Sequence, residues 1–123
     1  MSMNRKHNAH NPYQGSFKKV LCVCSAGLLR SPTAAWVLSN EPFHRNTRAC
    51  GIDVGHALIP LDDVLLEWAD EIVCMDAHQA KEVRAKTSKP VLCLDIDDSY
   101  AFRDTALVHK IRERYKQTSG WVQ

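Results

Sequence analysis

The chain has 123 residues, which is the usual size of a single domain. Apolar residues make up 45% of it and charged residues 24%, a balance typical of globular proteins and unlike that of disordered chains. No apolar run approaches the roughly 20 residues that a helix needs to cross a bilayer, so we expect no membrane-spanning segment.

The net charge of +2 is unevenly distributed, because residues 1–19 hold four Lys and Arg residues and no acidic residue. The rest of the chain is slightly acidic and has no continuous basic face that could neutralise many phosphates, so we expect no nucleic-acid partner. We predict a disordered leader over residues 1–17 and a single domain over residues 18–123. The five cysteines are an odd number and no secretory pattern accompanies them, which predicts reduced thiols in a cytoplasmic protein.

The first half of the chain predicts two strands, each followed by a helix. The run 19–24 (KVLCVC) has almost no polar interruption, as in a strand buried on both faces. A helix is then expected to begin with Ser31 as its N-cap and Pro32 at its first position. A weaker strand is expected at 47–52, and an amphipathic helix begins near Pro60.

The second half repeats the alternation of strand and helix twice. A strand is expected at 71–75, followed by a helix whose start has the capping-box pattern of Asp76 and Gln79. A fourth strand is expected at 90–94, and the acidic loop 95–104 leads into a last helix. This alternation predicts an α/β fold, a three-layer sandwich with a four-stranded parallel sheet and helices on both faces.

The segment after the first strand has the spacing C-x5-R-[ST], formed by Cys24, Arg30 and Ser31. Ligands of parallel sheets bind outside the carboxyl ends of the strands, where this segment is expected to lie. Five residues suffice to wrap backbone N–H groups around a tetrahedral anion, and the planar Arg30 fork matches two phosphoryl oxygens. The positive helix end and Arg30 favour the thiolate form of Cys24, which can attack phosphorus. The spacing therefore predicts a phosphate-binding loop made of Ser25, Ala26, Gly27, Leu28, Leu29, Arg30 and Ser31.

The run VLCVCSAGLLRSPTAAWVL resembles the signature of the low-molecular-weight protein tyrosine phosphatases, V-C-x5-R-S-P-x-A-E. Two later runs, WADEIVCMDAHQAKEV and LDIDDSYAFRDTALVHKIRERY, are similar to further segments of that family, most of all to a short bacterial branch of predicted phosphatases. The resemblance implies a phosphotyrosine phosphatase I-like fold and hydrolysis of phosphotyrosine in proteins through a phosphocysteine intermediate, without cofactor or metal. It implies that Cys24 is the nucleophile, Arg30 the phosphate clamp and Ser31 the partner of the thiolate.

The general acid of this family is the aspartate of a D-P-Y loop. Asp98 stands two residues before the tyrosine of the run DDSY, so the resemblance implies that Asp98 is the acid, while Asp97 and Asp95 stay open as rivals. The chain departs from the family where Gly27 replaces an asparagine, where Leu29 replaces a second cysteine of many members, and where the D-P-Y proline is absent. Some of the segment that builds the substrate rim is also missing, which leaves the choice of substrate open.

Three other functions compete with this interpretation. A phosphocysteine carrier similar to the sugar phosphotransferase IIB domains shares the V-C-S-A-G run, but such loops have hydroxyl residues where Arg30 stands. An arsenate reductase on the same fold needs two further cysteines a short helix apart, whereas Cys74 and Cys93 are far apart in the sequence. The third is a catalytically silent phosphate-binding module. We expect a monomer that acts on phosphotyrosyl proteins and has no membrane partner, and we expect Trp36 and Trp68 to be core or packing residues.

Overall fold

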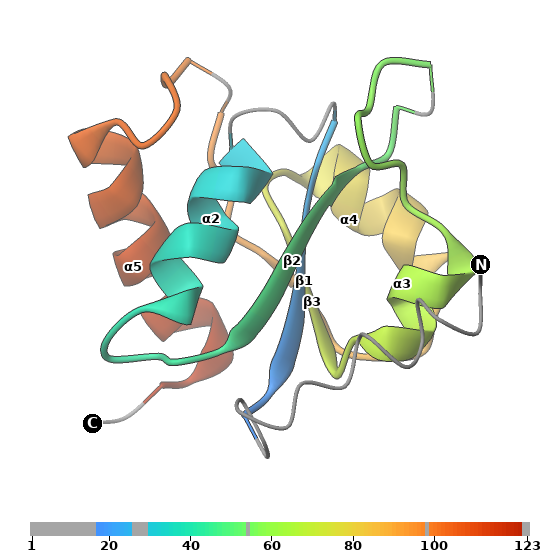
Figure 1. The fold of residues 1–123 in the computed structure, drawn as a ribbon, viewed down its shortest axis with the longest axis horizontal. Coiled ribbons are helices and arrows are strands. Elements are labelled where there is room, and N and C mark those ends of the chain that lie inside the picture. Colours follow the sequence, from blue (N-terminus) through green and yellow to red (C-terminus); the bar gives the residue numbers. More distant parts are fainter. Residues whose placement is uncertain (1–16, 26–29, 54, 98, 122–123) are drawn as a thin grey trace.

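The computed structural model describes residues 17–25, 30–53, 55–97 and 99–121 (Figure 1). Its four strands form one parallel sheet in the order β2-β1-β3-β4. The strands are β1 (Lys19–Cys24), β2 (Asn46–Gly51), β3 (Glu71–Cys74) and β4 (Val91–Cys93). The helices are α2 (Arg30–Ser39), α3 (Asp63–Trp68), α4 (Ala77–Arg84) and α5 (Thr105–Ser119). The predicted α/β sandwich with a four-stranded parallel sheet is confirmed, whereas the predicted leader, apart from Phe17, lies outside the described residues.

The helices cover the two faces of the sheet in pairs, with α2 and α5 on one face and α3 and α4 on the other (Figure 1). Side chains of β1 point alternately to the two faces: Val20 and Cys22 pack toward α2 and α5, while Leu21 and Val23 pack toward α3 and α4. All four side chains are fully buried. The central strand therefore has no polar face, which is why its sequence was readable as a strand buried on both sides.

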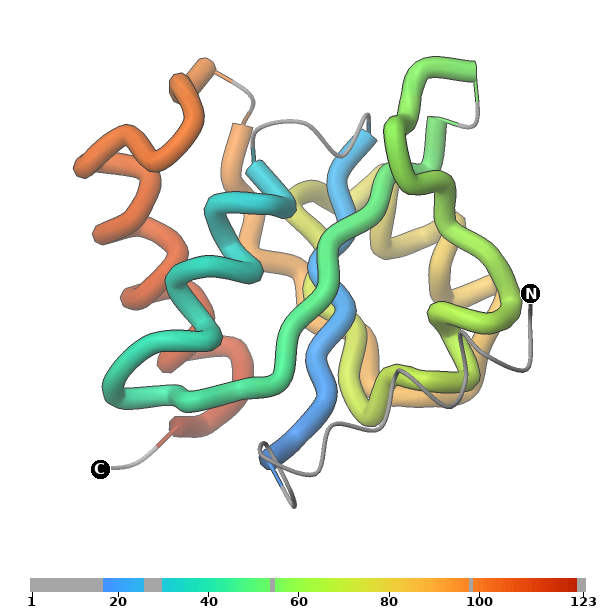
Figure 2. Tube along the Cα trace, in the orientation of Figure 1, coloured from blue at the N-terminus to red at the C-terminus, as the bar shows by residue number. Residues whose placement is uncertain are grey.

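The carboxyl ends of the strands meet at one edge of the sheet, where the segments after β2 and β4 also lie (Figure 2). Cys24 is the register partner of Gly51, and the N–H of Ile52 donates to the Cys24 carbonyl at 3.0 Å. The N–H of Met75, after β3, donates to the Val23 carbonyl at 3.2 Å. The topology thus places three segments distant in sequence around the end of β1.

Both edges of the sheet are partly covered. At the β2 edge, the N–H of Gly51 donates to the Ile59 carbonyl at 3.0 Å, and the N–H of Leu61 donates to the Gly51 carbonyl at 2.9 Å. At the β4 edge, the Arg84 guanidinium donates to the Val91 carbonyl at 3.0 Å. Because the segment from Ile59 to Leu61 is hydrogen-bonded to Gly51, it is not helical. The helix α3 therefore begins after its N-cap Asp62 and not near Pro60 as expected.

A polar network closes the opposite end of the sheet. The buried Tyr115 hydroxyl donates to the Glu71 carboxylate at 2.8 Å and accepts from Arg45 Nε at 3.0 Å, while Lys18 Nζ lies 3.4 Å from Glu71. Burial raises the pKa of Tyr115 well above its ordinary value, so the hydroxyl remains a donor at neutral pH. The buried carboxylate of Glu71 is thereby hydrogen-bonded and paired, as a buried charge requires.

Two expectations about individual residues are wrong. The helix α2 begins at Arg30, so Ser31 lies inside the helix and is not its N-cap. Trp36 is 39% exposed and lies under the guanidinium of Arg103 instead of in the core. Trp68, at 5% exposure, is a packing residue as predicted. In the described part of the chain, no helix combines the length and apolar character that crossing a membrane demands.

Candidate active site

Cys24 is the last residue of β1, and its side chain is buried. Its Sγ lies 3.1 Å from the Ser31 hydroxyl, which in turn donates to the Cys50 carbonyl at 3.2 Å. A serine hydroxyl has a single proton, so Ser31 can give that proton either to the carbonyl or to a thiolate at Cys24. The structure therefore brings Cys24 and Ser31 together in the way that stabilisation of a thiolate requires.

Arg30, the first residue of α2, is only 6% exposed. Its Nη1 donates to the Ile96 carbonyl at 2.7 Å and lies 3.5 Å from the Asp76 carboxylate. The side chain thus joins the start of α2 to the segments after β3 and β4. Among the described residues only Nη1 has partners, which leaves the other N–H groups of the fork free to bind an anion.

Gln79 of α4 is a site residue that the sequence interpretation missed. The predicted capping box is confirmed, since the Asp76 carboxylate accepts from the Gln79 N–H at 3.1 Å and Gln79 Oε1 accepts from the Asp76 N–H at 3.1 Å. The fully buried Gln79 amide also donates from Nε2 to the Ser25 hydroxyl at 3.2 Å. The position of Asp76 directly after a strand next to β1 was the one signal that could have indicated this contact.

The segment predicted to bind phosphate is described only at its two ends. The Ser25 carbonyl accepts from the Asp53 N–H at 2.7 Å, and Arg30 is held by the contacts given above. These contacts fix both ends of the loop at the carboxyl edge of the sheet. The predicted loop residues between them, Ala26, Gly27, Leu28 and Leu29, lie outside the described residues, as does Asp98.

The two rivals for the role of general acid are both described. Asp97 is exposed and accepts hydrogen bonds from the Ser99 hydroxyl and from the Ser99 N–H at 3.0 Å. These two hydrogen bonds lower the pKa of Asp97, which makes its carboxyl a weaker proton donor near neutrality. The Asp95 carboxylate is 85% exposed and lies 3.9 Å from Arg114 Nη1 on α5. The environment of Asp97 thus favours its ionised carboxylate over the protonated acid.

The other cysteines differ chemically from Cys24. Burial raises the pKa of Cys50 and of Cys74 to about 12 and that of Cys22 well above its ordinary value, so these thiols stay protonated and unreactive. Cys74 and Cys93 are register partners on neighbouring strands, a proximity that their spacing in the sequence did not indicate. They pack toward α3 and α4, whereas Cys24 packs toward α2 and α5, so the sheet lies between them and Cys24.

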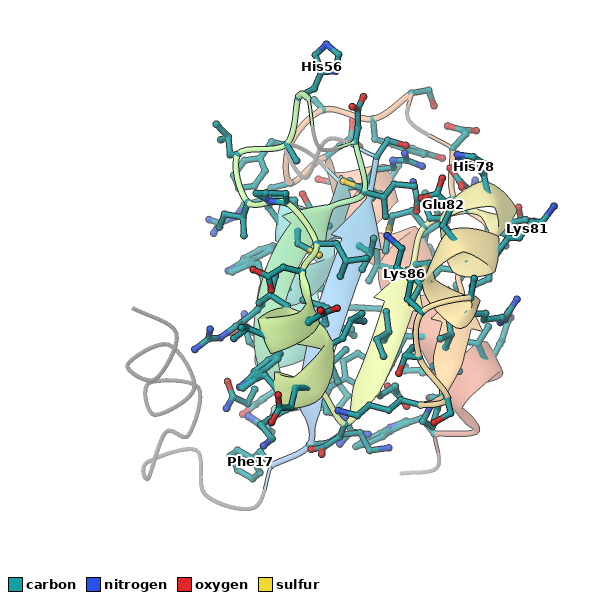
Figure 3. All side chains as sticks on the ribbon, turned by 90° about the vertical axis from the view of Figure 1, so that its right-hand side faces the viewer. Phe17, His56, His78, Lys81, Glu82 and Lys86 are labelled. Carbon is teal, nitrogen blue, oxygen red and sulfur yellow. The ribbon has the colours of Figure 1, made fainter. Side chains whose placement is uncertain are left out.

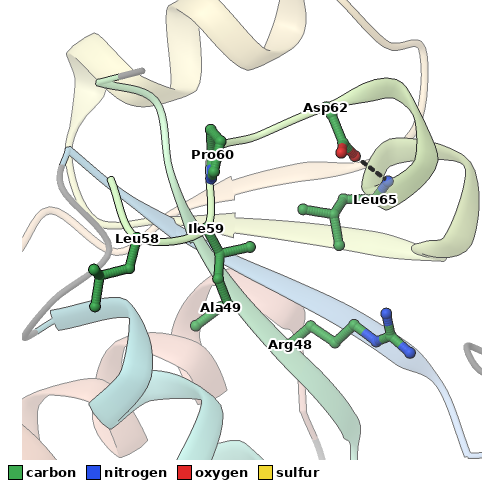
Figure 4. Close-up of a pocket in the computed structure, with 7 residues that line it drawn as sticks. All are labelled: Arg48, Ala49, Leu58, Ile59, Pro60, Asp62 and Leu65. Carbon is green, nitrogen blue, oxygen red and sulfur yellow. Dashed lines mark hydrogen bonds between the residues drawn. The ribbon is translucent and has the colours of Figure 1, made fainter. Parts of the chain in front are cut away.

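A cavity of about 570 Å³ lies apart from these residues, along the edge strand β2 (Figure 4). It is lined by Arg48, Ala49, Leu58, Ile59, Pro60, Asp62 and Leu65. None of the predicted site residues lines it. Within the described ranges, no three His, Cys, Asp or Glu side chains gather closely enough to hold a metal ion.

Comparisons with known proteins give relatives by structure and none by sequence. No model of a protein family matches the chain, and no curated protein matches it. The tyrosine phosphatase AmsI of Erwinia amylovora is 17% identical, with 85% of this chain and 92% of that chain covered and a TM-score of 0.65. The YwlE arginine phosphatase of Geobacillus stearothermophilus is 16% identical, with 84% and 86% covered and a TM-score of 0.57. A thioredoxin-dependent arsenate reductase of Corynebacterium glutamicum is 16% identical, with 96% and 70% covered and a TM-score of 0.62.

These likenesses establish the fold, and phosphatases are the main class among the structural neighbours. The chain therefore has the fold of the low-molecular-weight protein tyrosine phosphatases, the family that its C-x5-R-[ST] segment resembles.

Proposed function

We propose that the chain is a cysteine-dependent phosphatase that hydrolyses phosphotyrosine in proteins through a phosphocysteine intermediate. The observation that supports this best is the convergence of Cys24, Ser31 and Arg30 at the carboxyl edge of the sheet. There the sulfur lies 3.1 Å from a hydroxyl, and several N–H donors of a buried guanidinium have no partner in the described ranges. A thiol that is to act as a nucleophile needs both a partner for its ionised form and donors that bind the phosphoryl oxygens.

The reaction proceeds in two displacements. In the first, the Cys24 thiolate attacks phosphorus, the ester P–O bond breaks, and the departing phenolate takes a proton from Asp98. In the second, the Asp98 carboxylate removes a proton from water, which attacks phosphorus and breaks the S–P bond. Inorganic phosphate leaves and the thiolate is restored. Arg30 stabilises the charge on the phosphoryl oxygens in both steps, and the scheme requires no cofactor or metal.

The experiment that tests the proposal is a turnover screen of the purified protein with phosphotyrosine, phosphoserine and phosphoarginine peptides and with arsenate. We expect release of inorganic phosphate to be fastest from phosphotyrosine. Faster hydrolysis of phosphoarginine would make the chain an arginine phosphatase, and thiol-dependent reduction of arsenate would make it a reductase. A phosphoryl group retained on the protein without hydrolysis would identify a carrier, and binding of phosphate without any turnover would identify a silent module.

The choice of general acid gives a second test. Asp98→Asn should lower turnover of phenyl phosphate by about 10²- to 10⁴-fold, because a phenolate is a poor leaving group without a proton donor. The loss should be much smaller for an aryl phosphate whose phenol is strongly acidic. Asp97→Asn is the matched control, since it makes the same change of charge one residue away. A larger loss in Asp97→Asn than in Asp98→Asn would reverse the assignment.

We also propose that the protein works as a monomer in the cytoplasm. All five cysteines are free thiols, and a nucleophilic thiolate has to stay reduced, as cytoplasmic thiols are. Sedimentation of the purified protein at several concentrations measures the oligomeric state directly.

A further inference from the structure

The side chain of Arg103 is exposed and lies between two aromatic rings. Its guanidinium carbon is 4.3 Å from the ring centroid of Trp36 and 5.0 Å from that of Phe102. The two rings are themselves 39% and 48% exposed. Stacking of this kind holds a guanidinium in one orientation and leaves the N–H groups at its edge available.

This stack is attached to the candidate active site. The backbone N–H of Arg103 donates to the hydroxyl of Thr33 at 3.0 Å, and Thr33 lies in the first turns of α2, shortly after Ser31. The loop that carries Arg103 also includes Ile96, whose carbonyl accepts from Arg30. Both contacts hold the loop against the helix that begins at the phosphate-binding loop, so Arg103 lies at the rim of the site.

The positive charge of Arg103 has no acidic partner among the described residues. The nearest acid in the sequence, Asp104, is the N-cap of α5 and accepts from the Ala106 N–H at 2.8 Å. A preorganised guanidinium with no acidic partner among the residues described is suited to bind a carboxylate.

We propose that Arg103, stacked on Trp36 and Phe102, is a docking site for an acidic residue close to the phosphotyrosine of the substrate protein. This inference rests on the proposed function and adds a preference for acidic sequences to it. An extended peptide advances about 3.3 Å per residue, so a carboxylate two or three residues from the phosphotyrosine lies roughly 7–10 Å away from it.

Two phosphotyrosine peptides test this docking site, one with Glu and one with Lys at the positions two and three residues from the phosphotyrosine. We expect kcat/KM of the wild type to be about threefold to fivefold higher for the Glu peptide at low salt, and this preference to fade at high salt. Arg103→Gln should abolish the preference and Arg103→Glu should reverse it. Hydrolysis of p-nitrophenyl phosphate, which has no flanking residues, should be unchanged in both variants.

The matched control is Lys81→Glu, which makes the same reversal of charge on the exposed face of α4, across the sheet from α2 (Figure 3). Lys81→Glu should leave the peptide preference intact. Equal shifts in the Lys81 and Arg103 variants would mean that net charge alone sets the preference and would overturn the docking site.

Docking can also be measured without turnover. Calorimetric titration of the Cys24→Ser variant with each peptide gives the two affinities. A preference for the Glu peptide there that depends on Arg103 supports the site even if the screen assigns another reaction. Equal affinities for the two peptides refute the docking site. Failure to hydrolyse p-nitrophenyl phosphate refutes only the proposed function.

Discussion

Replacing Cys24 with serine should lower hydrolysis of p-nitrophenyl phosphate by on the order of 10³-fold or more, because the reaction loses its nucleophile. A serine hydroxyl is a much weaker nucleophile than the sulfur of Cys24, which lies 3.1 Å from the Ser31 hydroxyl. Phosphate should still bind, since the loop and Arg30 are unchanged. Initial rates and calorimetric titration with phosphate measure the two quantities separately.

The control for this variant is Cys93→Ser, which makes the same substitution at a partly exposed thiol on β4. It should keep nearly all of the activity, because Cys93 packs on the face of the sheet that carries α3 and α4. Substantial activity in Cys24→Ser would remove Cys24 from the mechanism. Loss of activity in both variants would point to a structural effect of the substitution.

Replacing Arg30 with lysine should lower kcat by about 10²- to 10³-fold even though the positive charge is kept. The guanidinium holds the Ile96 carbonyl with Nη1 and still has further N–H groups for two phosphoryl oxygens. A single ammonium cannot replace both sets of hydrogen bonds. We therefore expect a fall in kcat together with weaker binding of phosphate, both measurable from steady-state rates and product inhibition.

Arg84→Lys is the matched control for Arg30→Lys, because Arg84 also donates to a backbone carbonyl, that of Val91, but lies away from the candidate site. It should leave kcat unchanged. Thermal unfolding of both variants distinguishes a chemical loss from a loss of stability. Retention of more than half of the wild-type kcat in Arg30→Lys would contradict the role of Arg30 as phosphate clamp.

The sequence predicted best what depends on neighbouring residues. The strand Lys19–Cys24 was predicted to the residue, because burial on both faces excludes polar side chains from the whole run. The cap Asp76 was predicted for a similar reason, since a cap bonds N–H groups two or three residues away. The start of the helix after this strand was missed by two residues, since it begins at Arg30 and not at Pro32, an error that is common at helix ends.

What the sequence could not predict depends on contacts between distant segments. The Arg30 side chain bonds a carbonyl 66 positions later, and the Arg103 N–H bonds a hydroxyl 70 positions earlier. Helical periodicity carries no information about contacts with a distant segment. Trp36 was therefore expected in or against the core, whereas its ring stacks on the Arg103 guanidinium at the surface. The contact of Gln79 with Ser25 was missed for the same reason.

The way the two sheet edges are covered has a consequence for handling the protein at high concentration. Bare edge strands can recruit a strand of another molecule and start insoluble aggregates. Here the chain's own backbone occupies the outer side of Gly51, and on the other side Arg84 places a charged group on a strand of only three residues. At these positions a foreign strand has fewer backbone groups to bond, which discourages the growth of fibrils from the native state.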